Sequence, residues 1–215
     1  MKFKLFILPI LSLLASCSNS SLPKPQVSSS YRGEQFGIDR NINEATIDKY
    51  LNRKDAVYRD MRMLIDPANY GEIDGDSYLS GFVKGFEVVP FPYIAPLGEL
   101  PVSGAYSGDT LFSLDENNNY FSNYQESKQI IYDLFPQDKV IFLMCGGGGY
   151  AGMMKTFLIN LGYDANKIYN VGGYWFYEGS NNVEVKRISS DKTYYDFYKV
   201  SYHDIDFSSL TKIER

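Results

Sequence analysis

The sharpest change from apolar to polar character lies at residues 140–144, where an unbroken apolar run ends at Cys145 and four consecutive glycines follow. A fully apolar run of this length is typical of a strand buried on both faces of a parallel sheet. After the glycines, the spacing of apolar residues predicts a helix over residues 151–161, ended by Gly162. Residues 167–171 predict another strand. This part of the chain is therefore expected to fold as strand, glycine loop, helix and strand.

Strand and helix patterns also precede this unit. Residues 55–61 predict a short strand, and residues 81–94 contain a second one that two prolines would close. A capped helix is predicted near Asn43 and another after Ser122, because each is followed by apolar residues on one helical face. Alternating strands and helices predict an α/β domain with a mainly parallel sheet.

Two polar segments and the C-terminal part depart from this alternation. Residues 65–77 predict an acidic, turn-rich loop. Residues 95–119 form a long polar excursion, and their sequence leaves open whether they cover a site or bind a partner. Beyond Gly179 the pattern changes to short runs typical of strands or a hairpin. Residues 181–215 are therefore assigned to a C-terminal β extension.

The N-terminus has the pattern of a targeting segment. Lys2 and Lys4 precede an apolar stretch that contains Pro9 and is too short to span a bilayer. The sequence LASC that ends at Cys17 resembles a bacterial lipobox, which implies cleavage before Cys17 and a lipid on its sulfur. Two or more acyl chains would anchor the protein stably to a membrane. The alternative is an ordinary secretory signal or a small N-terminal helix.

These patterns divide the chain into four parts. Residues 1–16 are predicted to be a lipoprotein signal peptide, residues 17–33 a Ser/Pro-rich tether, residues 34–180 the folded domain and residues 181–215 the extension. A length of 215 residues with 44% hydrophobic residues fits one folded domain with extensions. The predicted location is extracytoplasmic, on a bacterial membrane.

Charge and cysteine content narrow the functional classes. Removal of Lys2 and Lys4 leaves 19 basic against 26 acidic residues, which argues against binding to nucleic acid and against a polybasic membrane patch. Lipidation of Cys17 would leave Cys145 as the only thiol, so no internal disulfide is expected. One histidine and one free thiol do not make a metal cluster, and neither a metal nor a cofactor is expected.

Three interpretations of the glycine loop stay open. Gly147, Gly149 and Gly152 match the G-x-G-x-x-G pattern of dinucleotide-binding loops, but the next strand ends without the acidic residue that would bind the ribose. A lone cysteine is most often a small buried hydrophobe, which is the second interpretation. The third is a nucleophile, because Cys145 lies where a strand leaves the sheet.

The third interpretation rests on the chemistry of thiolates. Thiolates form where backbone amides and a helix N-terminus stabilise negative charge, and glycines allow successive N–H groups to turn inward as an anion-binding nest. A helix dipole contributes about 0.3–1 kcal/mol. One pKa unit corresponds to about 1.4 kcal/mol, so the amides would have to supply the rest. A nucleophilic Cys145 is therefore expected to have a lowered pKa.

Short motifs between about residue 42 and Gly179 occur in the same order as in rhodanese-like domains, and the chain resembles that family. The motifs are Asp60-Met61-Arg62, Gly81-Phe82-Val83-Lys84-Gly85-Phe86, Cys145-Gly146-Gly147-Gly148-Gly149-Tyr150-Ala151, Leu161-Gly162-Tyr163-Asp164 and Val171-Gly172-Gly173. The resemblance implies a three-layer fold with a central, mainly parallel sheet. It also implies sulfur transfer, in which Cys145 takes the outer sulfur of a donor as a persulfide.

Asp60 and Arg62 are expected to form a structural ion pair beneath the loop and not to act as catalytic groups. The resemblance assigns a role to the loop itself. The terminal sulfur of the persulfide would be held by the loop amides of Gly146, Gly147, Gly148, Gly149, Tyr150 and Ala151. A thiol or cyanide would then accept the sulfur.

Two departures from the family pattern leave the function open. The arginine that closes the loop in the family is Tyr150 here, and the histidine of the second motif is Phe82. A hydrogen bond to a charged group is worth about 1.5–3 kcal/mol, so an anionic donor would bind more weakly. One hypothesis is a sulfurtransferase acting on a small sulfur-containing substrate. The other is a non-catalytic module that binds a ligand or a protein partner. A dyad of Cys145 with His203 is formally available to a thiol hydrolase, but His203 lies in the extension.

Overall fold

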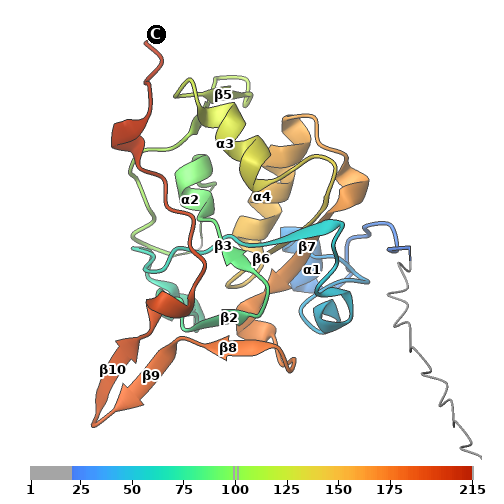
Figure 1. Ribbon diagram of the computed structural model, residues 1–215, viewed down its shortest axis with the longest axis vertical. Coiled ribbons are helices and arrows are strands. Elements are labelled where there is room, and N and C mark those ends of the chain that lie inside the picture. Colours follow the sequence, from blue (N-terminus) through green and yellow to red (C-terminus); the bar gives the residue numbers. More distant parts are fainter. Residues whose placement is uncertain (1–20, 99, 101, 215) are drawn as a thin grey trace, which may run out of the picture.

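The computed structural model of the chain describes residues 21–98, 100 and 102–214 (Figure 1). The predicted signal peptide, Cys17 and the first residues of the predicted tether lie outside the described residues. Within the described part of the chain, no helix combines the length and the apolar character that crossing a bilayer requires.

Short helices and strands alternate along the chain. The α-helices are α1 (Tyr31–Phe36), α2 (Phe91–Ile94), α3 (Ser127–Leu134) and α4 (Gly149–Asn160). The strands are β1 (Ala56–Asp60), β2 (Gly81–Val83), β3 (Glu87–Val88), β4 (Phe112–Leu114), β5 (Tyr120–Ser122), β6 (Val140–Cys145), β7 (Ile168–Gly173), β8 (Asn182–Glu184), β9 (Lys186–Ser189) and β10 (Lys192–Tyr195). The 3-10 helices are Ile47–Tyr50, Tyr70–Ile73, Ala165–Lys167, Tyr174–Phe176, Phe197–Lys199 and Phe207–Ser209.

A four-stranded parallel sheet in the order β3-β1-β6-β7 forms the centre of the fold. Its register places Tyr58 opposite Phe142, and Phe142 opposite Tyr169, on neighbouring strands. The rings of Tyr58 and Phe142 stack with centroids 5.2 Å apart, and those of Phe142 and Tyr169 lie at the same distance. Cross-strand aromatic pairs of this kind stabilise and fix the register of a sheet. The predicted α/β class with a parallel sheet is confirmed.

Alternate residues of β6 face two different clusters of buried side chains. Ile141, Leu143 and Cys145 pack with residues of α2, α3 and α4 on one face of the sheet. Phe142 and Met144 point to the other face, which is covered by Ile47 of a 3-10 helix and by irregular chain rather than by long helices. This period of two explains why the whole run is apolar, since both faces of the strand are buried.

The N-terminal segment begins to pack earlier than the sequence suggested. Val27 pairs with Asp39 in an antiparallel bridge, and the Tyr169 hydroxyl donates to the Pro23 carbonyl at 2.6 Å. Ser30 caps α1 by accepting from the Gly33 N–H at 3.1 Å. The described residues of the segment predicted as a tether, 21–33, therefore lie against the domain. A Ser- and Pro-rich composition predicted a solvated tether, but serine also caps helices, as Ser30 does here, so composition alone did not show that this segment packs.

The C-terminal residues form the predicted β-rich extension and are joined to the domain. Strand β8 pairs antiparallel with β2, and β9 and β10 form an antiparallel hairpin that projects from the body (Figure 1). The chain then returns beside the sheet, where Tyr202 pairs in parallel with Val88 of β3. The helix predicted after Ser122 begins at Ser127 instead, because residues 120–122 pair with β4.

Candidate active site around Cys145

Cys145 is the last residue of β6, and its side chain lies at the start of α4. The thiol is 2% exposed, and the Gly148 N–H donates to its Sγ atom at 3.1 Å. The Ala151 N–H also bonds to the sulfur. Two of the six amides that were predicted to form the cradle therefore point at the sulfur, one from the loop and one from the first turn of α4.

The pKa of Cys145 does not follow the expectation of a lowered value. Burial raises the pKa of the thiol above its ordinary value, and nearby Asp60 raises it further. The N–H groups of Ala151 and Gly148 and the charge of Arg62 lower it, without offsetting the burial. The prediction of a lowered pKa was wrong, because it counted the amides and the helix but could not count desolvation.

The loop has the shape that its glycines allow. Gly148 has φ of 112°, a conformation that residues with a Cβ rarely adopt, and it forms the N-cap of α4. The indole of Trp175 lies over the loop, so that a Cβ placed on Gly146 would come within 2.5 Å of its Cζ2 atom. The backbone N–H of Trp175 donates to the Gly146 carbonyl at 3.1 Å. The run of glycines is therefore needed for packing as well as for the turn.

A cavity of about 210 Å³ opens beside the cysteine and the glycines. Arg62, Asp66, Tyr150 and Trp175 all line it. Arg62 Nε donates to Asp60 Oδ1 at 2.9 Å, and its Nη2 donates to Asp60 Oδ2 at 2.6 Å. This is the buried pair that the sequence predicted under the loop. Arg62 also lines the cavity, which the assignment as a structural pair had not included.

Tyr150 occupies the loop position where the rhodanese-like pattern has arginine, and its hydroxyl is already paired. It donates to Asp66 Oδ2 at 2.9 Å, and it accepts from the Tyr70 hydroxyl at 2.7 Å. Burial raises the pKa of both tyrosines, so both hydroxyls stay protonated at neutral pH. The Tyr150 proton is thus directed at Asp66 rather than toward a bound donor.

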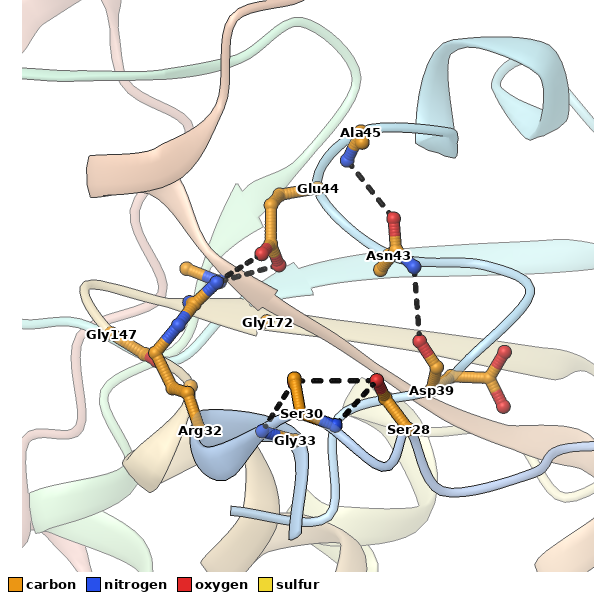
Figure 2. A network of polar contacts seen from close by, with 12 residues as sticks. Ser28, Ser30, Arg32, Gly33, Asp39, Asn43, Glu44, Ala45, Gly147 and Gly172 are labelled. Atoms are coloured by element: carbon orange, nitrogen blue, oxygen red, sulfur yellow. Dashed lines mark hydrogen bonds and ion pairs between the residues drawn. The ribbon is translucent and has the colours of Figure 1, made fainter. Parts of the chain in front are cut away.

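Arg32, from the N-terminal part of the described chain, also contacts the glycine loop. Arg32 of α1 forms an ion pair with Glu44 and donates from Nη1 to the Gly147 carbonyl at 3.3 Å (Figure 2). Glu44 also accepts from the Gly173 N–H at 3.3 Å. The arginine lies across the ring of Phe176, 3.6 Å from its centroid. These contacts tie the glycine loop to Arg32, which lies within the segment predicted as a tether, and through it to Glu44.

Neither dinucleotide binding at the glycine loop nor a dyad of Cys145 with His203 finds support in the geometry. Phe36 and Ile38 pack against Gly149 and Gly148, so the N-terminus of α4, where a dinucleotide phosphate would bind, is covered. His203 Nε2 lies 2.9 Å from Glu87 of β3, which also pairs with Arg59. His203 is not among the described residues that line the Cys145 cavity.

Sequence reasoning missed Asp66, Tyr70 and Trp175 as parts of the site. Asp66 and Tyr70 lie in the acidic loop of residues 65–77, where many polar residues could equally have faced solvent. Trp175 is the single tryptophan of the chain and follows the Gly172-Gly173 pair, which was the one available signal. In the described residues, His, Cys, Asp and Glu side chains do not form a group of three or more that could hold a metal ion.

No protein-family model matches the chain, and no curated protein or solved structure is significantly similar to it.

Proposed function

We propose that the chain is a lipid-anchored, rhodanese-like sulfurtransferase that forms a persulfide on Cys145 and passes the sulfur to a thiol or cyanide acceptor. The observation that carries the proposal is the position of the Cys145 sulfur, which receives two backbone N–H groups beside a cavity. Amide donors at this position would stabilise the charge of a thiolate and of the persulfide that replaces it.

The reaction needs no cofactor. Cys145 loses its proton to solvent, and the thiolate attacks the outer sulfur of a donor. A sulfur–sulfur bond forms to Cys145 while the bond inside the donor breaks, and the remainder of the donor leaves with the electron pair. An acceptor such as cyanide then attacks the terminal sulfur, and the Cys145 thiolate is regenerated. The cavity would hold the donor in the first step and the acceptor in the second.

The rhodanese-like fold is part of the proposal, and the arrangement of the sheet supports it. Each of three neighbouring parallel strands carries a motif residue of that family at its carboxyl end: Asp60 ends β1, Cys145 ends β6 and Gly173 ends β7. In open α/β sheets this edge is where ligands bind. The third layer of the proposed fold would be the 3-10 helix and the irregular chain opposite α3 and α4.

Intact-protein mass spectrometry tests the transfer step. The full-length chain would be incubated with thiosulfate, with a polysulfide or with no donor, and Cys145→Ser would serve as the control. The expected result is a gain of one sulfur atom that is absent from Cys145→Ser and is reversed by cyanide. No gain with any donor, while the fold is intact, would sink the proposal.

A second candidate is a non-catalytic rhodanese-like module that binds a ligand or a protein partner. Its support is the combination of a buried thiol with a raised pKa and a Tyr150 hydroxyl that is already paired. This candidate requires that the fold and ligand binding survive in Cys145→Ser, with no persulfide in the wild type.

The anchor on Cys17 and the extracytoplasmic location are proposed from the lipobox pattern alone. Only a few residues separate Cys17 from Leu22, which packs against the core, and from Pro23, whose carbonyl accepts from the Tyr169 hydroxyl. A lipid on Cys17 would therefore hold the domain close to the membrane surface. Cys17→Ser should remove label from radioactive palmitate and move the protein out of the membrane fraction. Retention of both in Cys17→Ser would refute the anchor.

A further inference from the structure

Arg62 has a charged donor that the fold does not use. Its side chain is 7% exposed, and its Nε and Nη2 atoms donate to Asp60 and to the Gly81 carbonyl. Its Nη1 atom is buried and has no hydrogen-bond partner among the described residues. A buried guanidinium nitrogen without an acceptor is costly, so such a group indicates an acceptor that binds there.

Trp175, which also lines the cavity, has a second unused donor. Its Nε1 atom is also buried without a hydrogen-bond partner in the described part of the chain. Arg62, Trp175 and Cys145 all line the cavity, and the charge of Arg62 acts on the Cys145 thiol. A cation and a neutral N–H that both lack acceptors, next to a sulfur atom, are suited to a small oxyanion.

The rest of the lining selects for an apolar body on that anion. It includes the side chains of Met63, Ile73, Leu79, Leu100, Met153 and Phe176. A cavity of about 150 Å³ holds benzene, so about 210 Å³ has room for one ring and an acidic head. Thiosulfate would leave this apolar surface uncovered.

Two acidic residues, Asp66 and Asp76, also line the cavity, and their charges would repel an anion. Asp66 is bonded to the hydroxyls of Tyr70 and Tyr150 and to the Ala68 N–H, and these donors screen its charge. Asp76 accepts from the Tyr78 N–H. Arg32 also lines the cavity, and it is held by Glu44 and the Gly147 carbonyl. Arg62 keeps a buried nitrogen without an acceptor even after its pairing with Asp60, so it has capacity left for a ligand.

We propose that Arg62 Nη1 and Trp175 Nε1 bind the sulfonyl oxygens of an organic thiosulfonate whose apolar group fills the cavity beside Cys145. The inference rests on the proposed sulfur transfer. The Cys145 thiolate attacks the terminal sulfur of R–SO₂–S⁻, and a persulfide forms. The bond between the two donor sulfurs breaks, and R–SO₂⁻ leaves with the electron pair. Arg62 is thereby assigned a role in substrate binding in addition to its pairing with Asp60.

The single tryptophan allows the binding step to be measured without any transfer. Full-length Cys145→Ser would be titrated with benzenesulfonate and with methanesulfonate, two inert oxyanions with the same head group. Fluorescence of Trp175, excited where tyrosine does not absorb, is the readout. We expect benzenesulfonate to bind about tenfold more tightly or better, because a ring buries more apolar area than a methyl group.

A matched pair of arginine variants tests the donor. Arg62→Lys keeps a cation next to Asp60 but loses the planar fork, so benzenesulfonate should bind roughly ten- to a hundredfold more weakly. Arg59→Lys makes the same change three residues earlier in the chain, at an arginine that pairs with Glu87 and lies outside the lining, and it should bind like its parent. Circular dichroism would verify that both variants fold.

The outcomes separate this inference from the proposed function. Equal binding of the two sulfonates, no binding, or equal effects of the two arginine variants would overturn it. If benzenesulfonate binds as expected but the wild type gains no sulfur from benzenethiosulfonate, the anion site stands and sulfur transfer is refuted. If the wild type forms the persulfide equally well from thiosulfate and benzenethiosulfonate, the assigned substrate class is refuted and transfer stands.

Discussion

Two groups of polar side chains line the cavity beside Cys145, and they differ in how their donors are used. The arginine group, Arg62 and Trp175, keeps two buried nitrogens that have no acceptor among the described residues. In the tyrosine group, the Tyr150 hydroxyl donates to Asp66, and the Tyr70 hydroxyl donates to Tyr150 and to Asp66. The first group therefore has donors left over, while the donors of the second are all used.

This difference changes the interpretation of Tyr150. Tyr150 stands at the loop position where the rhodanese-like pattern has an arginine. Its proton goes to Asp66, and the cation with an unused donor is Arg62, two residues beyond the end of β1. The cation that the family pattern places on the loop can thus be supplied by the chain that follows a neighbouring strand, because the carboxyl ends of parallel strands lie together.

The largest expected effect comes from removing the carboxylate of Asp60, which pairs with Arg62. Asp60→Ala would leave the Arg62 guanidinium buried without its carboxylate, and the loss of one partner from a buried pair costs about 3–5 kcal/mol. The free energy of unfolding in urea measures this. Asp55→Ala is the control, because it breaks a pair with Arg53 in which Asp55 is 48% exposed, where about 1 kcal/mol or less is expected. Equal losses would show that the Arg62 pair is not a buried one.

The tyrosine group should show a smaller loss and a coupling between its members. Tyr150→Phe removes a hydrogen bond to a carboxylate and should cost about 1.5–3 kcal/mol in thermal or urea unfolding. Tyr198→Phe, at a tyrosine that is 83% exposed, should stay within about 0.5 kcal/mol of the wild type.

A double-mutant cycle sharpens this prediction. Tyr70→Phe and Tyr150→Phe together should cost less than the sum of the single changes, because the two hydroxyls bond to each other. Strict additivity would mean that the two tyrosines do not form one network.

The contact of the loop with Trp175 gives a smaller effect with a close control. Gly146→Ala would place a Cβ 2.5 Å from Trp175 Cζ2, and shifting the partly exposed ring should cost about 1 kcal/mol. Gly147→Ala meets the same ring at 3.5 Å, an ordinary contact, and should leave its position unchanged. The emission of Trp175 should therefore shift in the first variant only. The same shift in both would mean that the ring does not rest on Gly146.

The strand, loop and helix around Cys145 could be predicted from the sequence because their signals are local. The apolar run of β6 and the period of α4 each follow from neighbouring residues, and both lie within a few residues of their expected bounds. The short β1 and β7 were found for the same reason.

The parts that could not be predicted depend on contacts between distant segments. Tyr150 meets Asp66 across 84 positions, and Arg32 meets Gly147 across 115. The burial of Cys145 likewise depends on side chains from several elements, so the direction of its pKa shift was not accessible from the glycines and the helix. The resemblance identified Asp60 and Arg62 as a pair, but it gave no sign that one nitrogen of Arg62 would be left over.

The raised pKa of Cys145 predicts the smallest effect, a change of stability with pH. An unfolded thiol has a pKa of about 8.5, and the folded protein holds this proton more tightly because the thiol is buried. The thiol's contribution to stability is therefore complete below about pH 8.5 and is lost as the pH rises toward the folded pKa, by at most about 1.4 kcal/mol per pH unit. Unfolding of the wild type and of Cys145→Ser, measured in parallel from neutral to alkaline pH, isolates this contribution from the tyrosines. The stability of the wild type relative to Cys145→Ser should fall as the pH rises. A rising difference would mean that the thiolate, not the thiol, is the form that the fold prefers. The arginine group and the loop amides would then outweigh the burial, and Cys145 would lose its proton more readily than an ordinary thiol.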